Sequence, residues 1–315
     1  MFRSGLEIPN GLLPSEVPQM ILLTFEGPII DQTFLLYKSL FGGIYRNPNG
    51  CPITSTFFIS NKWNNYDHTQ WLMDFGHEIA VNSVSYENLD NATVTRWEEE
   101  IVGMRSALQH FSHAKASDIL GVRAPKLRFG GDNQLDVMEK FGFVYDNSMI
   151  TSGGPFWPQT LAYRTAWECL SKFCPNKAHP KLWEIPINPL KFLNSQNEFN
   201  MLTEAITRKH SSSEIATILE FNLNRSYNYN RAPFLLTIDN DFFTLLPEKR
   251  AISALKLFIH NALKKSDIYM ITIKQALQWI KQPTRLMDIH NFEAWQCNQL
   301  VTGDLRPCQV SFLSS

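Results

Sequence analysis

Two acidic residues follow directly after long apolar runs of this sequence. The run Met20–Phe25 ends at Glu26, and the run Phe234–Ile238 ends at Asp239. A carboxylate at such a place can act as a general base, bind a cation or form an ion pair. These two residues are therefore the first candidates for catalytic chemistry.

Amide and carboxylate side chains extend this set. Asn82, Asn240 and Asp241 also follow apolar runs, and with Glu26 and Asp239 they could form an all-oxygen site for Ca²⁺ or Mg²⁺. Such cations need six or more well-aimed oxygens. A hydrogen-bonded polar pocket is therefore the interpretation that we favour.

Short apolar runs alternate with amphipathic helical patterns along the whole chain. The predicted strands are Met20–Phe25, Ser55–Ile59, Glu78–Val81, Ile119–Val122, Phe143–Tyr145, Leu182–Ile185, Phe234–Ile238 and Ile268–Ile271. The predicted helices are Asp31–Phe41, Thr95–His110, Gln134–Phe141, Ser213–Asn222, Lys249–Lys264 and Ile273–Lys281, with Thr95 and Ser212 or Ser213 as N-caps.

This alternation predicts an α/β fold with a parallel sheet. About eight strands with crossover helices would close into a (β/α) barrel whose working face lies at the carboxyl ends of the strands. The candidate residues all follow strands, so we expect them to meet at that face.

Composition limits the classes of protein to which the chain can belong. The chain has 315 residues, 44% hydrophobic and 19% charged, enough for one large core. A formal net charge of -1 gives no basic field for nucleic acid or an anionic membrane. No apolar stretch approaches a membrane span. We expect a monomer with neither kind of partner.

Cysteines and glycosylation sequons favour an oxidising compartment. Cys169 and Cys174 bracket a short loop, Cys297 and Cys308 lie in a polar tail, and Cys51 is left as the odd cysteine without a partner. The sequons begin at Asn91 and Asn224. We expect a secreted protein. Because no signal peptide is visible, we also expect a chain that is truncated upstream.

Several segments resemble one family when they are taken in order. They are Ile8–Leu12, Asn47–Cys51, Gly76–Val81, Gly121–Pro125, Arg231–Pro233 and Asn291–Trp295. The chain resembles the polysaccharide deacetylases of carbohydrate esterase family four, and within them the arthropod chitin deacetylases. The resemblance implies a distorted seven- or eight-stranded TIM-like barrel at 19–285, an N-terminal arm at 1–18 and a C-terminal extension at 286–315.

The same resemblance implies a divalent-metal site whose ligands are replaced here. The family's base-and-ligand motif Thr-Phe-Asp-Asp reads Thr-Phe-Glu26-Gly27 in this chain. The two histidine ligands, four residues apart, correspond to Asn82 and Tyr86, and the histidine acid corresponds to Asp239. We therefore expect a degenerate base, a degenerate acid and no metal ligand at these positions.

Loss of these ligands has a chemical consequence. Catalytic zinc commonly has three protein ligands and an open position, and it lowers the pKa of bound water to about 7. An asparagine amide and a tyrosine phenol are poor zinc ligands, so we expect no cofactor. With an ordinary aspartate pKa of about 3.9, Asp239 would be ionised and could not protonate a leaving amine.

Other features of the family's site are retained. The resemblance implies that Arg123 pairs with Asp146, and that Trp157 walls an acetate pocket at the barrel mouth. Pro125 is retained, and the tyrosine that follows it in the family is Lys126 here, which still supplies a backbone N–H. We expect these five residues to form a substrate-binding groove.

Aromatic residues outside these motifs allow two interpretations. In the segment Trp63–Trp71 the rings either stack on sugar or pack under a loop. Tyr227 and Tyr229 allow the same two interpretations. His77 precedes a strand, faces the other end of the barrel and is expected to be structural.

Our leading hypothesis is a catalytically inactive protein that binds chitin or chitosan oligomers in an extracellular matrix. One alternative is an active metal-dependent chitin deacetylase with a rearranged site built on Glu26 and Asp239. The other is a component of a chitin matrix that binds other matrix proteins and no sugar.

Overall fold

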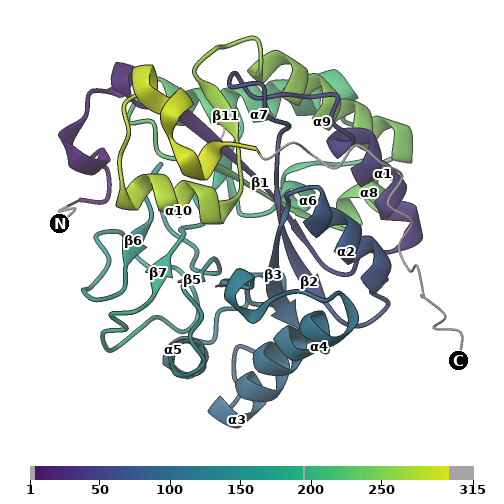
Figure 1. Ribbon diagram of the computed structural model, residues 1–315, viewed down its shortest axis with the longest axis vertical. Coiled ribbons are helices and arrows are strands. Elements are labelled where there is room, and N and C mark those ends of the chain that lie inside the picture. The colour runs from purple at the N-terminus through teal and green to yellow at the C-terminus, as the bar shows by residue number, and fades with distance from the viewer. Residues whose placement is uncertain (1–3, 194–195, 298–315) are drawn as a thin grey trace, which may run out of the picture.

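A curled, mainly parallel sheet forms the centre of the computed structural model, which describes residues 4–193 and 196–297 (Figure 1). Nine strands form it in the order β10-β1-β2-β3-β4-β5-β7-β6, with β11 paired to β1. The strands are β1 (Gln19–Glu26), β2 (Thr56–Ser60), β3 (Glu78–Ser83), β4 (Gly121–Val122), β5 (Tyr145–Asp146), β6 (Gln159–Thr160), β7 (Trp183–Glu184), β10 (Phe234–Asp239) and β11 (Ile268–Met270). A separate antiparallel pair consists of β8 (Leu190–Lys191) and β9 (Glu198–Phe199).

Helices surround the strands on the outside of the sheet (Figure 1). They are α1 (Asp31–Phe41), α2 (Tyr66–Asp74), α3 (Val94–Trp97), α4 (Gly103–Phe111), α5 (Asp132–Lys140), α6 (Leu202–Ala205), α7 (Ser212–Tyr227), α8 (Asp241–Leu245), α9 (Glu248–Ala262) and α10 (Ile273–Lys281). The predicted (β/α) barrel is confirmed, in a distorted form: β6 pairs antiparallel with β7, and β6 and β10 end the path of the sheet.

Side-chain alternation along β1 explains what faces the inside of the barrel. Ile21, Leu23 and Phe25 belong to the core between sheet and helices, whereas Met20 and Leu22 belong to the core inside the barrel. Because successive side chains of a strand point to opposite faces, the residues two and four positions after Leu22 also point inward. Those residues are Thr24 and Glu26.

Four of the six predicted helices begin one or two residues earlier than expected. The expected helix Thr95–His110 consists of α3, a π-helical segment at Glu98–Val102 and α4, and its N-cap is Thr93. Ser211, not Ser212 or Ser213, caps α7 by accepting a hydrogen bond from the Glu214 N–H. The helix α2 was not predicted, because its sequence combines aromatic and polar residues with a weak periodic pattern.

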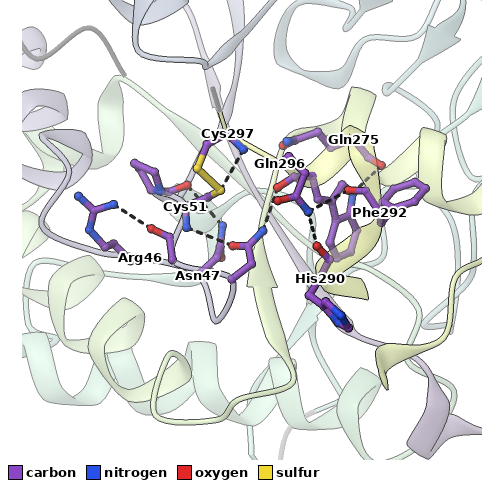
Figure 2. Close-up of a disulfide and its surroundings, with 12 residues drawn as sticks. Arg46, Asn47, Cys51, Gln275, His290, Phe292, Gln296 and Cys297 are labelled. Atoms are coloured by element: carbon purple, nitrogen blue, oxygen red, sulfur yellow. Dashed lines mark hydrogen bonds between the residues drawn. A yellow bond between two sulfur atoms is a disulfide. The ribbon is translucent and has the colours of Figure 1, made fainter. Parts of the chain in front are cut away.

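The disulfides correct one expectation. Cys169 and Cys174 are bonded as expected, but Cys51 is bonded to Cys297, 246 residues away (Figure 2). Cys51 is therefore not the odd cysteine, because Cys297 is its partner. Cys308 itself lies outside the described residues.

The segment that precedes β1 lies beside the segment that follows α10 (Figure 1). Arg285, just after α10, forms an ion pair with Glu16, just before β1, at 3.3 Å. Within the described residues, no helix is both long and apolar enough to span a membrane.

Candidate functional site

Glu26 is the last residue of β1 and points into the barrel at the carboxyl end of the strands. Only 2% of its surface is exposed. One oxygen, Oε1, accepts hydrogen bonds from the Lys126 backbone N–H at 2.7 Å and from the Tyr86 hydroxyl at 3.3 Å. The other oxygen, Oε2, has no hydrogen-bond partner among the described residues.

Burial dominates the acidity of this carboxyl group. It raises the pKa of Glu26 to about 7, although the Arg123 charge and the Lys126 and Tyr86 hydrogen bonds act in the opposite direction. The neighbouring Asp239 charge adds to the increase. Glu26 is therefore about half protonated at neutral pH, unlike an ordinary surface glutamate.

Asp239 lies beside Glu26 because β10 runs parallel to β1 and pairs these two residues in register. Its Oδ1 accepts hydrogen bonds from the Thr203 hydroxyl at 2.8 Å and from the Phe242 N–H at 3.1 Å. Burial, followed by the charge of Asp241, raises the pKa of Asp239. The degenerate base and acid positions are thus brought together as the sequence analysis expected.

The three positions that the resemblance aligns with metal ligands hold Gly27, Asn82 and Tyr86. Gly27 has a φ of 115°, and a Cβ added there would lie 3.0 Å from the Asn240 side-chain nitrogen. The Asn82 amide nitrogen donates to the Arg123 carbonyl, so the side chain is engaged with the sheet. Within the described residues, no group of three or more histidine, cysteine, aspartate or glutamate side chains could hold a metal ion. The donors present therefore do not fit the divalent metal that the resemblance implies.

Tyr86 takes the place of a ligand and turns toward the base position. Its backbone adopts a φ of 59°, and its N–H donates to the Ser83 hydroxyl at 2.9 Å. Burial, followed by the charge of Glu26, raises the pKa of the phenol. The phenol therefore stays protonated and donates to the ionised form of Glu26.

The residues of the alternative hard-cation site make hydrogen bonds to other parts of the protein. The Asn240 amide nitrogen donates to the Pro28 carbonyl at 2.9 Å, and Asn82 is directed at the Arg123 carbonyl. Two of the five oxygen-bearing side chains are thus held by the backbone. This arrangement agrees with a hydrogen-bonded polar pocket.

Arg123 lies behind Glu26 in the interior and is completely buried. It donates to the Thr24 hydroxyl at 2.7 Å and to the Asn147 side-chain oxygen, and its guanidinium lies 4.1 Å from the centre of the Phe58 ring. Burial lowers its pKa to about 10, so it remains charged at neutral pH. Its Nη1 has no partner among the described residues, and its charge interacts with that of Glu26.

Asp146 does not form the expected ion pair with Arg123. Tyr145 points into the barrel, so Asp146, the next residue, points to the helix side, where Gln134 of α5 donates to it at 2.6 Å. The residue that reaches Arg123 is instead Asn147, one position later. Asp146 is therefore a structural carboxylate.

A second carboxyl group joins Asp146 on the helix side. Glu184 is paired with Asp146 through strand register, and its Oε1 accepts a hydrogen bond from the Met149 N–H at 3.1 Å. Burial raises the pKa of Asp146 to about 6 and that of Glu184 well above its ordinary value. These shifts favour a proton shared between the two carboxyl groups at neutral pH.

Sequence reasoning missed Asn147 and Glu184. Strand parity could have identified both, because Tyr145 and Ile185 are the bulky apolar neighbours that point inward.

Trp157 does not wall a pocket at the mouth. The side chain is fully buried, stacks on Trp279 of α10 and donates its indole N–H to the Asn230 carbonyl at 3.1 Å. Asn230 precedes β10, so these contacts lie at the amino end of the strands. The expectation is wrong because Trp157 fills the inner core at the amino end of the strands, where protein covers its ring.

Pro125 and Lys126 do lie at the mouth. Pro125 is buried, whereas Lys126 is exposed, adopts a φ of 53° and places its ammonium 5.6 Å from the centre of the Tyr86 ring. Lys126 also borders a surface depression of about 240 Å³. Its polar lining includes Asp90, Lys126, Arg128, Ser171, Lys172, Asn200 and Glu204.

His77, Trp71 and Trp63 lie in different environments. His77 is buried, accepts a hydrogen bond from the Ser55 N–H, and has its pKa lowered by burial to about 3, so it is neutral and structural as expected. Trp71 stacks on Phe75 at 3.9 Å. Trp63, in contrast, is 79% exposed.

Comparison with known proteins identifies relatives by sequence. No protein-family model matches the chain. Chitin deacetylase 1 of Bombyx mori is 33% identical over 316 residues, which cover 96% of this chain and 58% of the relative. Chitin deacetylase 8 of Bombyx mori is 28% identical over 315 residues, which cover 96% of this chain and 80% of the relative. The chain thus spans little more than half the length of the first relative.

Comparison of folds agrees. A crystal structure from Mycobacterium smegmatis that is described as a polysaccharide deacetylase superposes with a TM-score of 0.57 at 15% identity. The match covers 87% of this chain and 94% of that one. At this identity the likeness concerns the fold.

Proposed function

Because this chain belongs to the polysaccharide deacetylase family and its two Bombyx mori relatives are chitin deacetylases, we propose that it binds chitin or chitosan chains without deacetylating them. The observation that carries this proposal is the hydrogen bond from the Tyr86 hydroxyl to Glu26. Tyr86, which corresponds to a metal ligand of the family, thus contacts Glu26, which corresponds to the family's catalytic base.

Loss of hydrolysis follows from the chemistry of the donors. Attack on an acetamide at neutral pH needs a water molecule with a lowered pKa, which a metal with suitable ligands supplies in this family. Gly27 has no side chain, and the Asn82 amide is engaged with a backbone carbonyl. Glu26 alone, with a pKa of about 7, would have to deprotonate ordinary water, whose pKa is about 15.7.

Sugar binding does not depend on those ligands. The depression beside Lys126 presents ammonium, guanidinium, carboxylate and amide groups within about 240 Å³. Such groups suit the hydroxyl and acetamide groups of an amino sugar, and binding of a ground state needs no metal. The proposed binding site is therefore this depression at the mouth of the barrel, which is bordered by Lys126 and Glu204.

An extracellular location supports a matrix role. The two disulfides fit an oxidising compartment, and both sequon asparagines, Asn91 and Asn224, are exposed. We propose that the protein is secreted and that its natural ligand is the chitin of an extracellular matrix.

Two assays test the proposal. Acetate release from chitin oligomers is measured with added zinc or cobalt, beside metal analysis of the purified protein. We expect no turnover above background. Turnover that a chelator abolishes would instead establish the active deacetylase, the alternative favoured by the pKa of Glu26 near 7 beside Asp239.

Binding is tested separately by pull-down with colloidal chitin. We expect Lys126→Ala to weaken retention, because it removes an ammonium donor to the hydroxyl and acetamide oxygens of the sugar. The matched control is Lys115→Ala, which removes an exposed ammonium group before β4 at the amino end of the strands. Absence of retention for the parent protein would remove the sugar-binding proposal and leave binding of other matrix proteins.

A further inference from the structure

Trp63 occupies an unusual position in the loop between β2 and α2. It is the third residue of a four-residue turn closed by the Asn64 N–H and the Asn61 carbonyl at 2.9 Å, and its φ is 69°. Glycine or asparagine is usual where a turn requires a positive φ, since a side chain with a Cβ is disfavoured there. A tryptophan that is 79% exposed gains little from burial in return.

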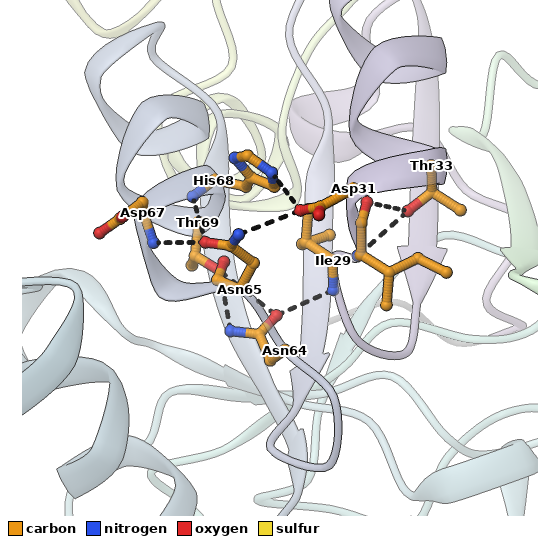
Figure 3. Close-up of polar contacts among 9 residues, drawn as sticks. Ile29, Asp31, Thr33, Asn64, Asn65, Asp67, His68 and Thr69 are labelled. Atoms are coloured by element: carbon orange, nitrogen blue, oxygen red, sulfur yellow. Dashed lines mark hydrogen bonds and ion pairs between the residues drawn. The ribbon is translucent and has the colours of Figure 1, made fainter. Parts of the chain in front are cut away.

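Hydrogen bonds join the loop that carries Trp63 to the connection between β1 and α1 (Figure 3). The Asn64 side-chain oxygen accepts a hydrogen bond from the Ile29 N–H at 2.8 Å, and the Asn65 N–H donates to the Ile29 carbonyl at 2.8 Å. The Asn64 amide nitrogen also donates to the Thr69 hydroxyl at 3.0 Å. These bonds fix the backbone on the C-terminal side of Trp63.

The first turns of α1 and α2 complete this support. Asp31, at the start of α1, accepts hydrogen bonds from Asn65 at 3.1 Å and from the His68 ring at 2.8 Å (Figure 3). The His68 ring in turn stacks on Phe34 at 3.7 Å. Two helices and two loops therefore hold the backbone that carries the exposed indole, which lowers the conformational entropy that the loop loses when a ligand binds.

The surroundings of Trp63 are open and polar. The turn follows the carboxyl end of β2, so it lies at the same end of the barrel as Glu26. A shallow depression with a volume of about 690 Å³ lies beside the indole. It is lined by Ile30, Asp31, Trp63, Asn64, Asn65, Tyr66 and Asp67.

We propose that Trp63 is a stacking platform for one sugar ring of a bound β-linked amino-sugar chain, outside the barrel mouth. The C–H face of a pyranose packs on an indole, while the neighbouring amide and carboxylate groups suit its hydroxyl and amino substituents. This inference rests on the proposed function, because the mouth must hold other units of the same chain. Only a chain long enough to reach both places would use the platform.

The test compares oligomer lengths and exploits the backbone conformation. Trp63→Gly removes the ring and suits the positive φ, so we expect unchanged or higher thermal stability. We expect its affinity for a chitosan or chitin hexamer to fall about five- to tenfold, with little change for the dimer. Trp63→Phe should retain most of the affinity for the hexamer.

A matched control and a spectroscopic readout separate binding from structure. Tyr229→Ala removes an aromatic ring that is 56% exposed before β10, at the opposite end of the barrel, and should not alter affinity. The hexamer should also shift the emission of the parent protein but not that of Trp63→Phe.

Two results would overturn the inference in distinguishable ways. If Trp63→Gly binds the hexamer as tightly as the parent protein, the platform is refuted and the proposed function stands. If the parent protein binds no oligomer of any length, both fall together.

Discussion

The Tyr86 hydroxyl lies 3.3 Å from the Glu26 carboxylate and donates to it. The phenol stabilises the charged form of a carboxyl group that burial makes reluctant to ionise. A residue that the resemblance aligns with a metal ligand thus contributes to the acid–base properties of the pocket.

Replacement of Tyr86 by phenylalanine tests this contact. The change removes one donor to the carboxylate, worth about 1 kcal/mol, so the pKa of Glu26 should rise by about half to one unit above 7. The measurement is an NMR titration of the Glu26 side-chain carboxyl. Tyr66→Phe, which removes a hydroxyl bonded to Asn61, is the control and should leave this pKa unchanged. A lower pKa in Tyr86→Phe would contradict the assignment.

The pH dependence of stability follows from the same residue. Burial raises the pKa of Glu26 from 4.5 to about 7, so the folded state binds more protons than the unfolded state between these values. Stability should therefore be fully present below about pH 4.5 and decrease as pH rises through 7. The gap corresponds to roughly 3 kcal/mol for this residue.

Glu26→Gln removes that titration, so we expect the variant to be more stable than the parent protein at pH 8 and to lose less stability between pH 5 and pH 8. Urea unfolding across this range measures both effects. The exposed Asp118→Asn is the control. A variant that is less stable than the parent at pH 8 would refute the assigned pKa shift.

A third prediction concerns the carboxyl pair Asp146 and Glu184 on the helix side of the sheet. In Glu184→Gln the amide can still donate to Asp146 and accept from the Met149 N–H, but the pair can no longer carry two negative charges. We expect the melting temperature at pH 7 to be equal to or above that of the parent protein. Glu184→Ala should instead lower it, because Asp146 loses its donor inside the core. Equal destabilisation by both variants would contradict a shared proton.

Strand parity decided which site residues could be predicted. Glu26 and Asp239 lie at inward positions after Leu22 and Leu235, so their meeting followed from the alternating pattern of two strands. Asp146 follows the inward Tyr145 and therefore points away from Arg123. A motif match alone did not contain that information.

Contacts between distant segments could not be predicted from local patterns. Trp157 is buried by Trp279 and by the carbonyl of Asn230, which come from other parts of the chain. Its sequence context is equally compatible with an exposed loop. The same holds for the bond between Cys51 and Cys297, because sequence spacing favours a nearer partner.

The two disulfides should differ in their contribution to stability. Cys51–Cys297 closes a loop of 246 residues and Cys169–Cys174 one of 5 residues. Loop-closure entropy assigns roughly 5 kcal/mol to the long loop and roughly 2 kcal/mol to the short one. We expect the double serine variant at Cys51 and Cys297 to lose more stability in urea unfolding than the one at Cys169 and Cys174. The reverse order would show that native-state strain outweighs chain entropy.

Reconstruction of a metal site tests whether the pocket was closed only by its substituted residues. Gly27→Asp with Asn82→His and Tyr86→His restores the family's ligand types. Gly27 has a φ of 115°, and a new Cβ would lie 3.0 Å from the Asn240 amide nitrogen. The aspartate is therefore strained, and we expect weak zinc binding in calorimetry. Adding Asn240→Ala relieves the close contact and should increase zinc affinity over the triple variant. Equal affinity with and without Asn240→Ala would show that the backbone of the Gly27 turn, and not the neighbouring side chain, prevents coordination.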